Sequence, residues 1–171
     1  REFDSVSRII LPGVGTYQEA MKRLHNLRLV DSILEHVQDK QLPFLGICIG
    51  EQILSTLGTE FVETPGLNLI PGKTIKIDFE KTDVVLPHMG WNEVSVVKKS
   101  PLFYDLSEGS CFYFVHSYHL IPDSAELVSS YCNYGGKITA TVERENVFGV
   151  QFHPEKSQSA GLQLLKNFCK L

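Results

Sequence analysis

The chain has 171 residues, enough for a sizeable core, and we expect residues 1–171 to form a single domain. Its net charge of −4 and pI near 5.9 give no electrostatic reason to expect nucleic acid or an anionic membrane surface as a partner, and no apolar run approaches the roughly 20 residues of a membrane span. The four cysteines are scattered without a C-x-x-C pair, which predicts neither a metal centre nor a disulfide framework and favours a cytoplasmic location.

The beginning of the chain alternates short apolar runs with helical patterns. Residues 7–11 (SRIIL) predict a buried strand that ends at the loop 12–15 (PGVG), and helices are expected over about residues 17–28 and 29–40. A second buried strand is predicted at 42–46 (LPFLG). A helix-like stretch, EQILSTL, begins at Glu51. This alternation is typical of an α/β fold.

A reactive cysteine is expected where the second strand ends. Cys48 has a glycine two places before it and another two places after it, the pattern of a nucleophile elbow with Cys in place of Ser. The glycines permit a tight bend, and the helix N-terminus behind the cysteine would favour a thiolate. A buried cysteine without chemistry fits this segment equally well.

The second half of the chain is richer in strands. After Pro65 the apolar residues alternate in short runs, and a final helix is expected over about residues 159–169. The predicted strands are 74–79 (TIKIDF), 91–97 (WNEVSVV), 111–120 (CFYFVHSYHL), 126–132 (ELVSSYC), 137–143 (KITATVE) and 146–152 (NVFGVQF). We therefore expect a mixed central sheet, flanked by helices and carrying an antiparallel extension.

A histidine and a carboxylate follow the last predicted strand. In an extended stretch, alternation places the side chains of His153 and Glu155 on the same side, and Pro154 stiffens the segment. A nucleophilic cysteine needs a base, and that imidazole needs a third group to orient it. Cys48, His153 and Glu155 can fill these three roles, so we predict that they form a catalytic triad.

At this point the chain resembles a known family. GICIGEQ at 46–52 and QFHPEKS at 151–157 are similar to motifs of the class I (triad) glutamine amidotransferases. Segments 11–21 (LPGVGTYQEAM), 87–94 (PHMGWNEV) and 113–119 (YFVHSYH) narrow the resemblance to the glutaminase subunits of imidazole glycerol phosphate synthase. The resemblance covers nearly the whole chain and implies a flavodoxin-like fold.

The chain departs from the family in three places. Relatives begin with a further strand and helix of about 30 residues, and their absence here is expected to uncover a sheet edge. The stretch 55–66 is shorter than the corresponding stretch of relatives. Glu51 stands where relatives often carry an apolar residue, and we expect it to face solvent, because an inward carboxylate would oppose thiolate formation.

The resemblance also implies roles for residues around the nucleophile. Oxyanion donors are expected among Gly13, Val14, Gly15 and Ile49. The glutamine substrate is expected to lie along Gln52, His116, Ser117 and Tyr118, and a synthase partner is expected to contact Trp91 and Lys156. A purely structural role stays open for each: an ordinary turn, a solvated helix residue, a core tryptophan, a solvated lysine.

The function that the resemblance implies is glutamine hydrolysis through a thioester on Cys48. The ammonia would pass to a (β/α)8 cyclase subunit that makes imidazole glycerol phosphate and an aminoimidazole carboxamide ribotide in histidine biosynthesis. No cofactor is expected, and no metal, because His116 and His119 lack a third ligand at a useful spacing. Two alternatives stay open: an amidotransferase that feeds another synthase, such as one making amino sugars, and a non-catalytic interaction subunit.

Overall fold

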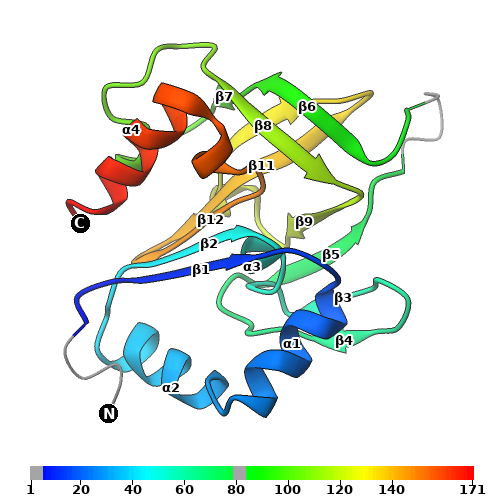
Figure 1. The fold of residues 1–171 in the computed structure, drawn as a ribbon, viewed down its shortest axis with the longest axis vertical. Helices are drawn as coiled ribbons and strands as arrows, with labels where there is room; N and C mark the ends of the chain where they lie inside the picture. The colour runs from blue at the N-terminus through cyan, green and yellow to red at the C-terminus, as the bar shows by residue number, and fades with distance from the viewer. Residues whose placement is uncertain (1–5, 79–83) are drawn as a thin grey trace.

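The computed structural model describes residues 6–78 and 84–171, and its centre is a six-stranded sheet in the order β1-β2-β12-β11-β10-β7 (Figure 1). The strands are β1 (Ile9–Gly13), β2 (Phe44–Cys48), β12 (Val147–Val150), β11 (Lys137–Arg144), β10 (Val128–Asn133) and β7 (Ser95–Val96). β2 runs parallel to both β1 and β12, whereas the remaining pairs are antiparallel. The prediction of an α/β fold with a mixed sheet is confirmed.

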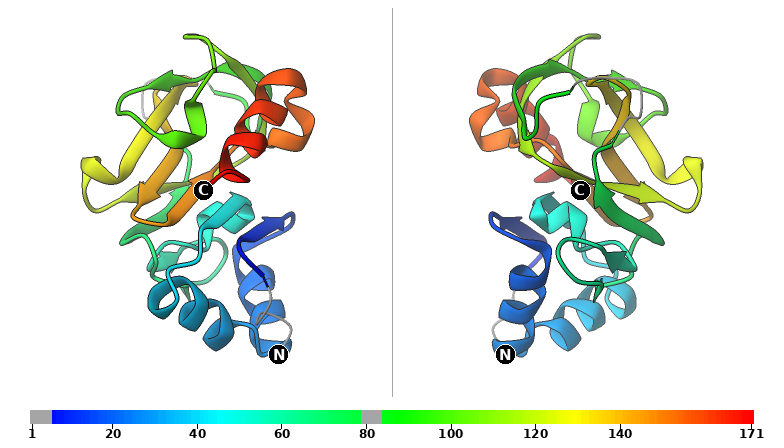
Figure 2. Two further views of the ribbon diagram at one scale, coloured as in Figure 1. Left: turned by 90° about the vertical axis from the view of Figure 1, so that its left-hand side faces the viewer. Right: turned by 90° about the vertical axis from the view of Figure 1, so that its right-hand side faces the viewer.

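Helices cover both faces of this sheet (Figures 1 and 2). On one face lie α1 (Tyr17–Asn26) and α2 (Val30–Leu34), and α2 continues into one π-helical turn, η1 (Glu35–Asp39). On the opposite face lies α4 (Gln158–Phe168), close to its predicted range. None of the helices in the described ranges is long and apolar enough to cross a membrane.

Two smaller sheets take the place of the single extension that was predicted. One has the order β4-β3-β5-β9, and the other pairs β6 with β8. Their strands are β3 (Leu57–Gly58), β4 (Thr64–Pro65), β5 (Gly72–Lys76), β9 (Tyr118–Pro122), β6 (His88–Glu93) and β8 (Cys111–His116). The predicted strand 111–120 is therefore two strands that part at Ser117, because β8 pairs with β6 and β9 with β5. Similarly, 91–97 divides at Val94; Phe79, the end of the strand predicted at 74–79, lies outside the described residues.

Each face of the central sheet has its own hydrophobic core. The α1 and α2 side is filled by side chains such as Tyr17, Met21 and Ile53. The α4 side is filled by side chains such as Phe152 and Phe168. Since β2 lies between these cores, all five of its residues are buried, as a continuous apolar run predicts.

The junction between β2 and α3 (Ile49–Gln52) is packed too tightly for side chains on its glycines. A Cβ on Gly50 would lie 1.8 Å from the carbonyl oxygen of Leu11, and a Cβ on Gly46 would lie 2.3 Å from that of Gly50. Glycine is needed at both positions so that β1, β2 and α3 can approach one another. The helix expected from EQILSTL is shorter than predicted, since α3 ends at Gln52 and β3 follows.

Candidate active site

A pocket of about 330 Å³ opens where the parallel strands β1 and β2 end. Such carboxyl ends are the usual place for ligands in open α/β sheets. The pocket is lined by Val14, Gly15, Cys48, Ile49, Gln52, Glu60, Pro87, Val115, His116, Ser117, Tyr118 and His153. Another cavity, of about 360 Å³, lies beside Glu93 and Glu108, but its lining contains neither a histidine nor a cysteine. The pocket at the strand ends is therefore the candidate active site.

Cys48 occupies the turn between β2 and α3 in a strained backbone conformation. Its φ is +55° and its ψ is −110°, a region that residues with a side chain rarely adopt. The thiol is 5% exposed, and its sulfur accepts a hydrogen bond from the side-chain amide of Gln151 at 3.8 Å. The nucleophile elbow predicted from the glycine spacing is present in this geometry.

The cysteine is not a thiolate at rest, contrary to the expectation from the helix N-terminus. Burial raises the pKa of Cys48 to about 12, and the backbone N–H of Ile49 opposes this only in part. The helix behind the cysteine has four residues, so its contribution is small. A thiol of this kind becomes a nucleophile only when a base removes its proton.

His153 lines the same pocket and is oriented by Glu155. The Nδ1 of His153 lies 2.7 Å from the Glu155 carboxylate, which accepts a hydrogen bond from Nδ1–H, so the lone pair of the neutral ring is on Nε2. That Nε2 atom is buried and has no hydrogen-bond partner among the described residues. An oriented imidazole with a free lone pair is suited to act as a general base.

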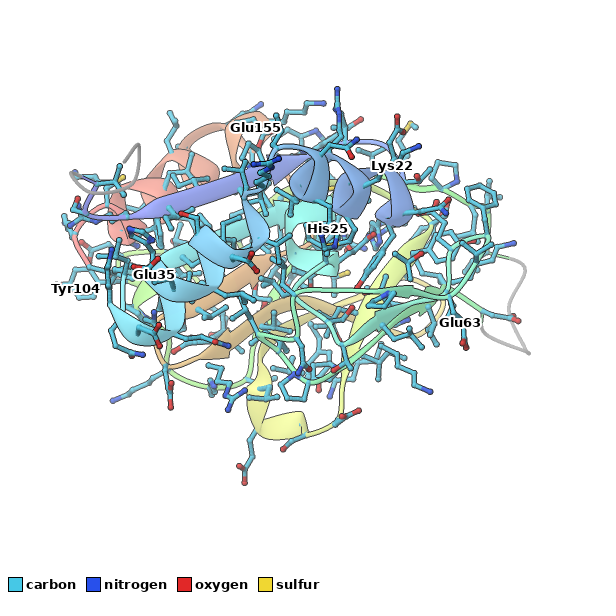
Figure 3. The ribbon with its side chains drawn as sticks, turned by 90° about the horizontal axis from the view of Figure 1, so that it is seen from below. Lys22, His25, Glu35, Glu63, Tyr104 and Glu155 are labelled. Atoms are coloured by element: carbon cyan, nitrogen blue, oxygen red, sulfur yellow. The ribbon has the colours of Figure 1, made fainter. Side chains whose placement is uncertain are left out.

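The geometry of the His153–Glu155 pair differs from the extended stretch that was predicted. Residues Pro154–Lys156 form a 3₁₀ turn, which brings the carboxylate back to the ring. The backbone N–H of His153 donates to the Tyr113 carbonyl at 2.8 Å and fixes the segment to β8. Glu155 itself is half-exposed and lies at the edge of the molecule in Figure 3.

Most of the other predicted site residues line the pocket, but three do not. Gly13 is not among the residues that line this pocket, and a Cβ at its position would lie 3.1 Å from the Cβ of Ile49. Trp91 and Lys156 lie outside the pocket, against the Tyr113 ring at 6.1 Å and 5.8 Å from its centroid. Their position on the surface is compatible with the predicted partner contact.

The Gln52 side chain, which was predicted to hold the substrate, is itself held by hydrogen bonds within the protein. Its amide nitrogen donates to the Tyr118 carbonyl and to the Gln151 side-chain oxygen, both at 2.9 Å. Both N–H groups are therefore used within the protein. Any contact of this side chain with a substrate would have to use its oxygen.

Glu60 is a pocket residue that the sequence analysis missed. It lies in the stretch 55–66, and one carboxylate oxygen accepts the backbone N–H of Tyr17 at 2.7 Å. It is the one carboxylate among the residues that line this pocket in the described part of the chain. The sequence shows Glu60 only as one of two acids, with Glu63, in an irregular segment, and nothing in that segment distinguishes the two.

Glu51 is buried, so the expectation that it faces solvent is wrong. Its exposed fraction is 0%, its Cγ packs over Gly149, and both carboxylate oxygens lack hydrogen-bond partners among the described residues. Burial raises the pKa of Glu51 well above its ordinary value, which keeps the group neutral.

The sequence is similar to those of known proteins over nearly its whole length. Residues 2–171 match the family model for Glutamine amidotransferase class-I. The protein named imidazole glycerol phosphate synthase subunit HisH from Syntrophotalea carbinolica is 44% identical over 165 residues, which are 94% of this chain and 80% of the relative. The protein of the same name from Pelagibacter ubique is 42% identical over 168 residues, which are 98% of this chain and 81% of the relative. The solved structure of PurLQS from Thermotoga maritima has a TM-score of 0.72 at 18% identity, covering 98% of this chain and 80% of that chain, a likeness of fold alone.

Replacing the buried carboxyl group should stabilise the protein in a pH-dependent way. We expect Glu51→Met to raise the free energy of unfolding at neutral pH by roughly 1–3 kcal/mol, the usual cost of a buried polar group without a partner. Because the folded pKa is raised, the folded protein keeps a proton that the unfolded chain releases. The wild type therefore loses stability as pH rises above the ordinary glutamic acid range, and the advantage of the variant grows.

Urea unfolding of both proteins between about pH 5 and pH 8.5 measures this difference. The exposed Glu108→Met variant is the control and should stay within about 0.5 kcal/mol of the wild type. An advantage of Glu51→Met that is the same at every pH would contradict the assignment of a neutral buried acid.

Proposed function

The chain belongs to the class-I glutamine amidotransferases, and we propose that it is the glutaminase subunit of imidazole glycerol phosphate synthase, supplying ammonia for histidine biosynthesis. The observation that carries the chemistry is that Cys48 and His153 line one pocket, with the Nε2 of His153 unbonded. Identities of 44% and 42% to HisH subunits support this synthase in particular. The match over residues 2–171 supports the prediction of one glutaminase domain.

The proposed reaction begins with proton transfer from a neutral thiol. His153 Nε2 takes the Cys48 proton as the sulfur attacks the side-chain carbonyl carbon of glutamine, and Glu155 stabilises the resulting imidazolium. The tetrahedral intermediate collapses as His153 returns the proton to the nitrogen, and ammonia leaves. Water, deprotonated by His153, then hydrolyses the glutamyl thioester, releases glutamate and restores the thiol.

The negative oxygen of the tetrahedral intermediate needs donors that are already in place. We assign this role to the backbone N–H groups of Ile49, directly after Cys48, and Val14, since both residues line the pocket. Gly15 has a φ of +102°, a conformation open to glycine, so the 13–15 loop can present or withdraw the Val14 peptide at low steric cost. Gly13 acts through this loop and does not contact the substrate.

The amino-acid end of glutamine is proposed to bind beside Glu60 in the pocket. The Glu60 carboxylate is placed to pair with the α-ammonium group, since it is the pocket's charged acceptor. Residues His116, Ser117 and Tyr118 form the wall along which the substrate lies. The side-chain oxygen of Gln52 is available as a further acceptor.

A contact surface for the synthase subunit is proposed around the pocket mouth. Val14, Met89 and Trp91 are 77%, 61% and 49% exposed, and Met89 pairs with the pocket residue Val115 across the β6–β8 sheet. Exposed apolar side chains that lie together are typical of interaction surfaces. The proposed partner is a (β/α)8 cyclase joined by a tunnel, because ammonia must arrive unprotonated. All four cysteines are free thiols, which fits a reducing cytoplasm.

Removing the sulfur should abolish glutamine hydrolysis. We expect Cys48→Ala and His153→Ala to lower glutamate release, measured with the cyclase subunit present, by about a thousandfold or more. Cys132→Ala is the matched control, because burial raises the pKa of Cys132 to about 12 as well but this cysteine lies outside the pocket. Substantial turnover by Cys48→Ala would refute the proposed nucleophile.

Neutralising the pocket carboxylate should weaken glutamine binding selectively. We expect Glu60→Gln to raise the KM for glutamine about 10- to 100-fold, as for the loss of a charge-assisted hydrogen bond, with little change in kcat. The amide oxygen can still accept the Tyr17 N–H, so the fold is retained. Glu63→Gln, at an exposed position nearby in the chain and labelled in Figure 3, should leave KM unchanged. Equal KM values for the two variants would contradict the assignment.

A further inference from the structure

A buried hydrogen-bonded chain connects strand β6 to the pocket wall. His88 on β6 and His116 on β8 are paired across the two strands, and Nδ1 of His88 lies 2.9 Å from Nε2 of His116. The Nδ1 of His116 lies 2.8 Å from the carbonyl oxygen of Tyr118, a pocket residue. At the other end, the Asn92 amide nitrogen lies 3.3 Å from Nε2 of His88.

The groups at the two ends of this segment determine which partner donates in each of its hydrogen bonds. The Tyr118 carbonyl can only accept, so the proton of His116 is on Nδ1 and its Nε2 accepts from His88. His88 then carries its proton on Nδ1, and its Nε2 accepts from Asn92. Burial lowers the pKa of His88 to about 4 and that of His116 to about 3, so both rings are neutral at neutral pH.

The chain continues beyond the pocket wall to the nucleophile. The Tyr118 carbonyl also accepts from the Gln52 side chain, which donates its second N–H to Gln151. Gln151 in turn donates to the sulfur of Cys48. One polar network therefore runs from Asn92 to the sulfur of Cys48, although neither histidine transfers a proton in the proposed reaction.

Strand β6 joins this network to the exposed surface. Its residues alternate, so Met89 and Trp91 face outward while His88 and Asn92 face the network. The His88 ring is stacked between Phe114 and Tyr134, with centroid distances of 4.7 Å and 4.0 Å. Because the ring is held on both faces, a shift of β6 has to move its hydrogen bond to His116.

We propose that His88 is a positioning residue for glutamine hydrolysis, which transmits contacts on the outer face of β6 through His116 to the Tyr118 carbonyl, Gln52 and Cys48. The inference rests on the proposed function, because the contacts are those of the synthase subunit. A partner seated on Met89 and Trp91 fixes β6, and the network then fixes the pocket wall and the sulfur. His88 acts through His116 and does not touch the substrate.

The test compares three replacements of His88 in the complete complex with the synthase subunit. His88→Asn keeps an N–H donor at the place of Nδ1, His88→Gln keeps a polar group only at the place of Nε2, and His88→Phe fills the stacked space without hydrogen bonds. His119→Phe is the matched control, since none of the hydrogen bonds of the network involves this buried histidine. The assays measure kcat, the KM for glutamine, the Kd of the synthase subunit, and the rate at which iodoacetamide alkylates Cys48.

We expect His88→Phe and His88→Gln to lower kcat on the order of tenfold, with the Kd of the synthase subunit within about twofold of wild type. His88→Asn and His119→Phe should keep wild-type kcat within about threefold. The partner should accelerate Cys48 alkylation in wild type and His88→Asn but not in His88→Gln.

Equal kcat values for His88→Asn and His88→Gln would overturn the proposal, and this comparison holds even if His88→Phe does not fold. A merely structural histidine would change stability in all three variants and leave the effect of the partner on alkylation intact, which also overturns the proposal. If wild type itself releases no glutamate with the synthase subunit, the proposed function fails together with this inference.

Discussion

Cys48 is held at a φ of +55° in a turn where neither neighbouring glycine has room for a Cβ. The close approach of the Leu11 carbonyl to Gly50 locks β1 against this turn, so the strand before the 13–15 loop and the strand before Cys48 are fixed together. The pocket exists because these two strands end at the same level. Every proposed donor and base is positioned relative to that one strained junction.

The same burial that fixes the sulfur also makes it unreactive at rest. Its pKa is raised to about 12, and the neutral Glu51 on α3 does nothing to lower it. In the proposed reaction, ionisation of the thiol then depends on His153, whose Nε2 has no hydrogen-bond partner among the described residues, and on donors that act once glutamine is bound. A thiol that ionises only in the assembled complex would waste little glutamine when no synthase subunit is present. The buried network through His88 and Gln151 is a physical route by which assembly can reach the sulfur.

Local sequence was sufficient to place β1, β2, α1 and α4 approximately and to select the three residues of the proposed triad. Glycine spacing around Cys48 and the His-Pro-Glu segment have physical meanings that do not depend on distant residues, although the catalytic roles remain predictions. Burial of Glu51 could not be predicted, because it depends on the space above Gly149, nearly a hundred positions later in the chain. The division of 111–120 at Ser117 and the pairing of His88 with His116 likewise depend on which strands meet. The π-helical turn at Glu35–Asp39 has no signal in the helical pattern that precedes it.

The central claim is that a buried sulfur at this junction attacks the side-chain carbonyl of glutamine. Incubation of the complex with a diazoketone analogue of glutamine, followed by peptide mass spectrometry, tests it most directly. The account predicts a single adduct on Cys48, prevented by excess glutamine, while Cys111, Cys132 and Cys169 stay unmodified. Failure to modify Cys48 in a complex that makes imidazole glycerol phosphate from glutamine, or an adduct on another cysteine that glutamine prevents, would contradict it.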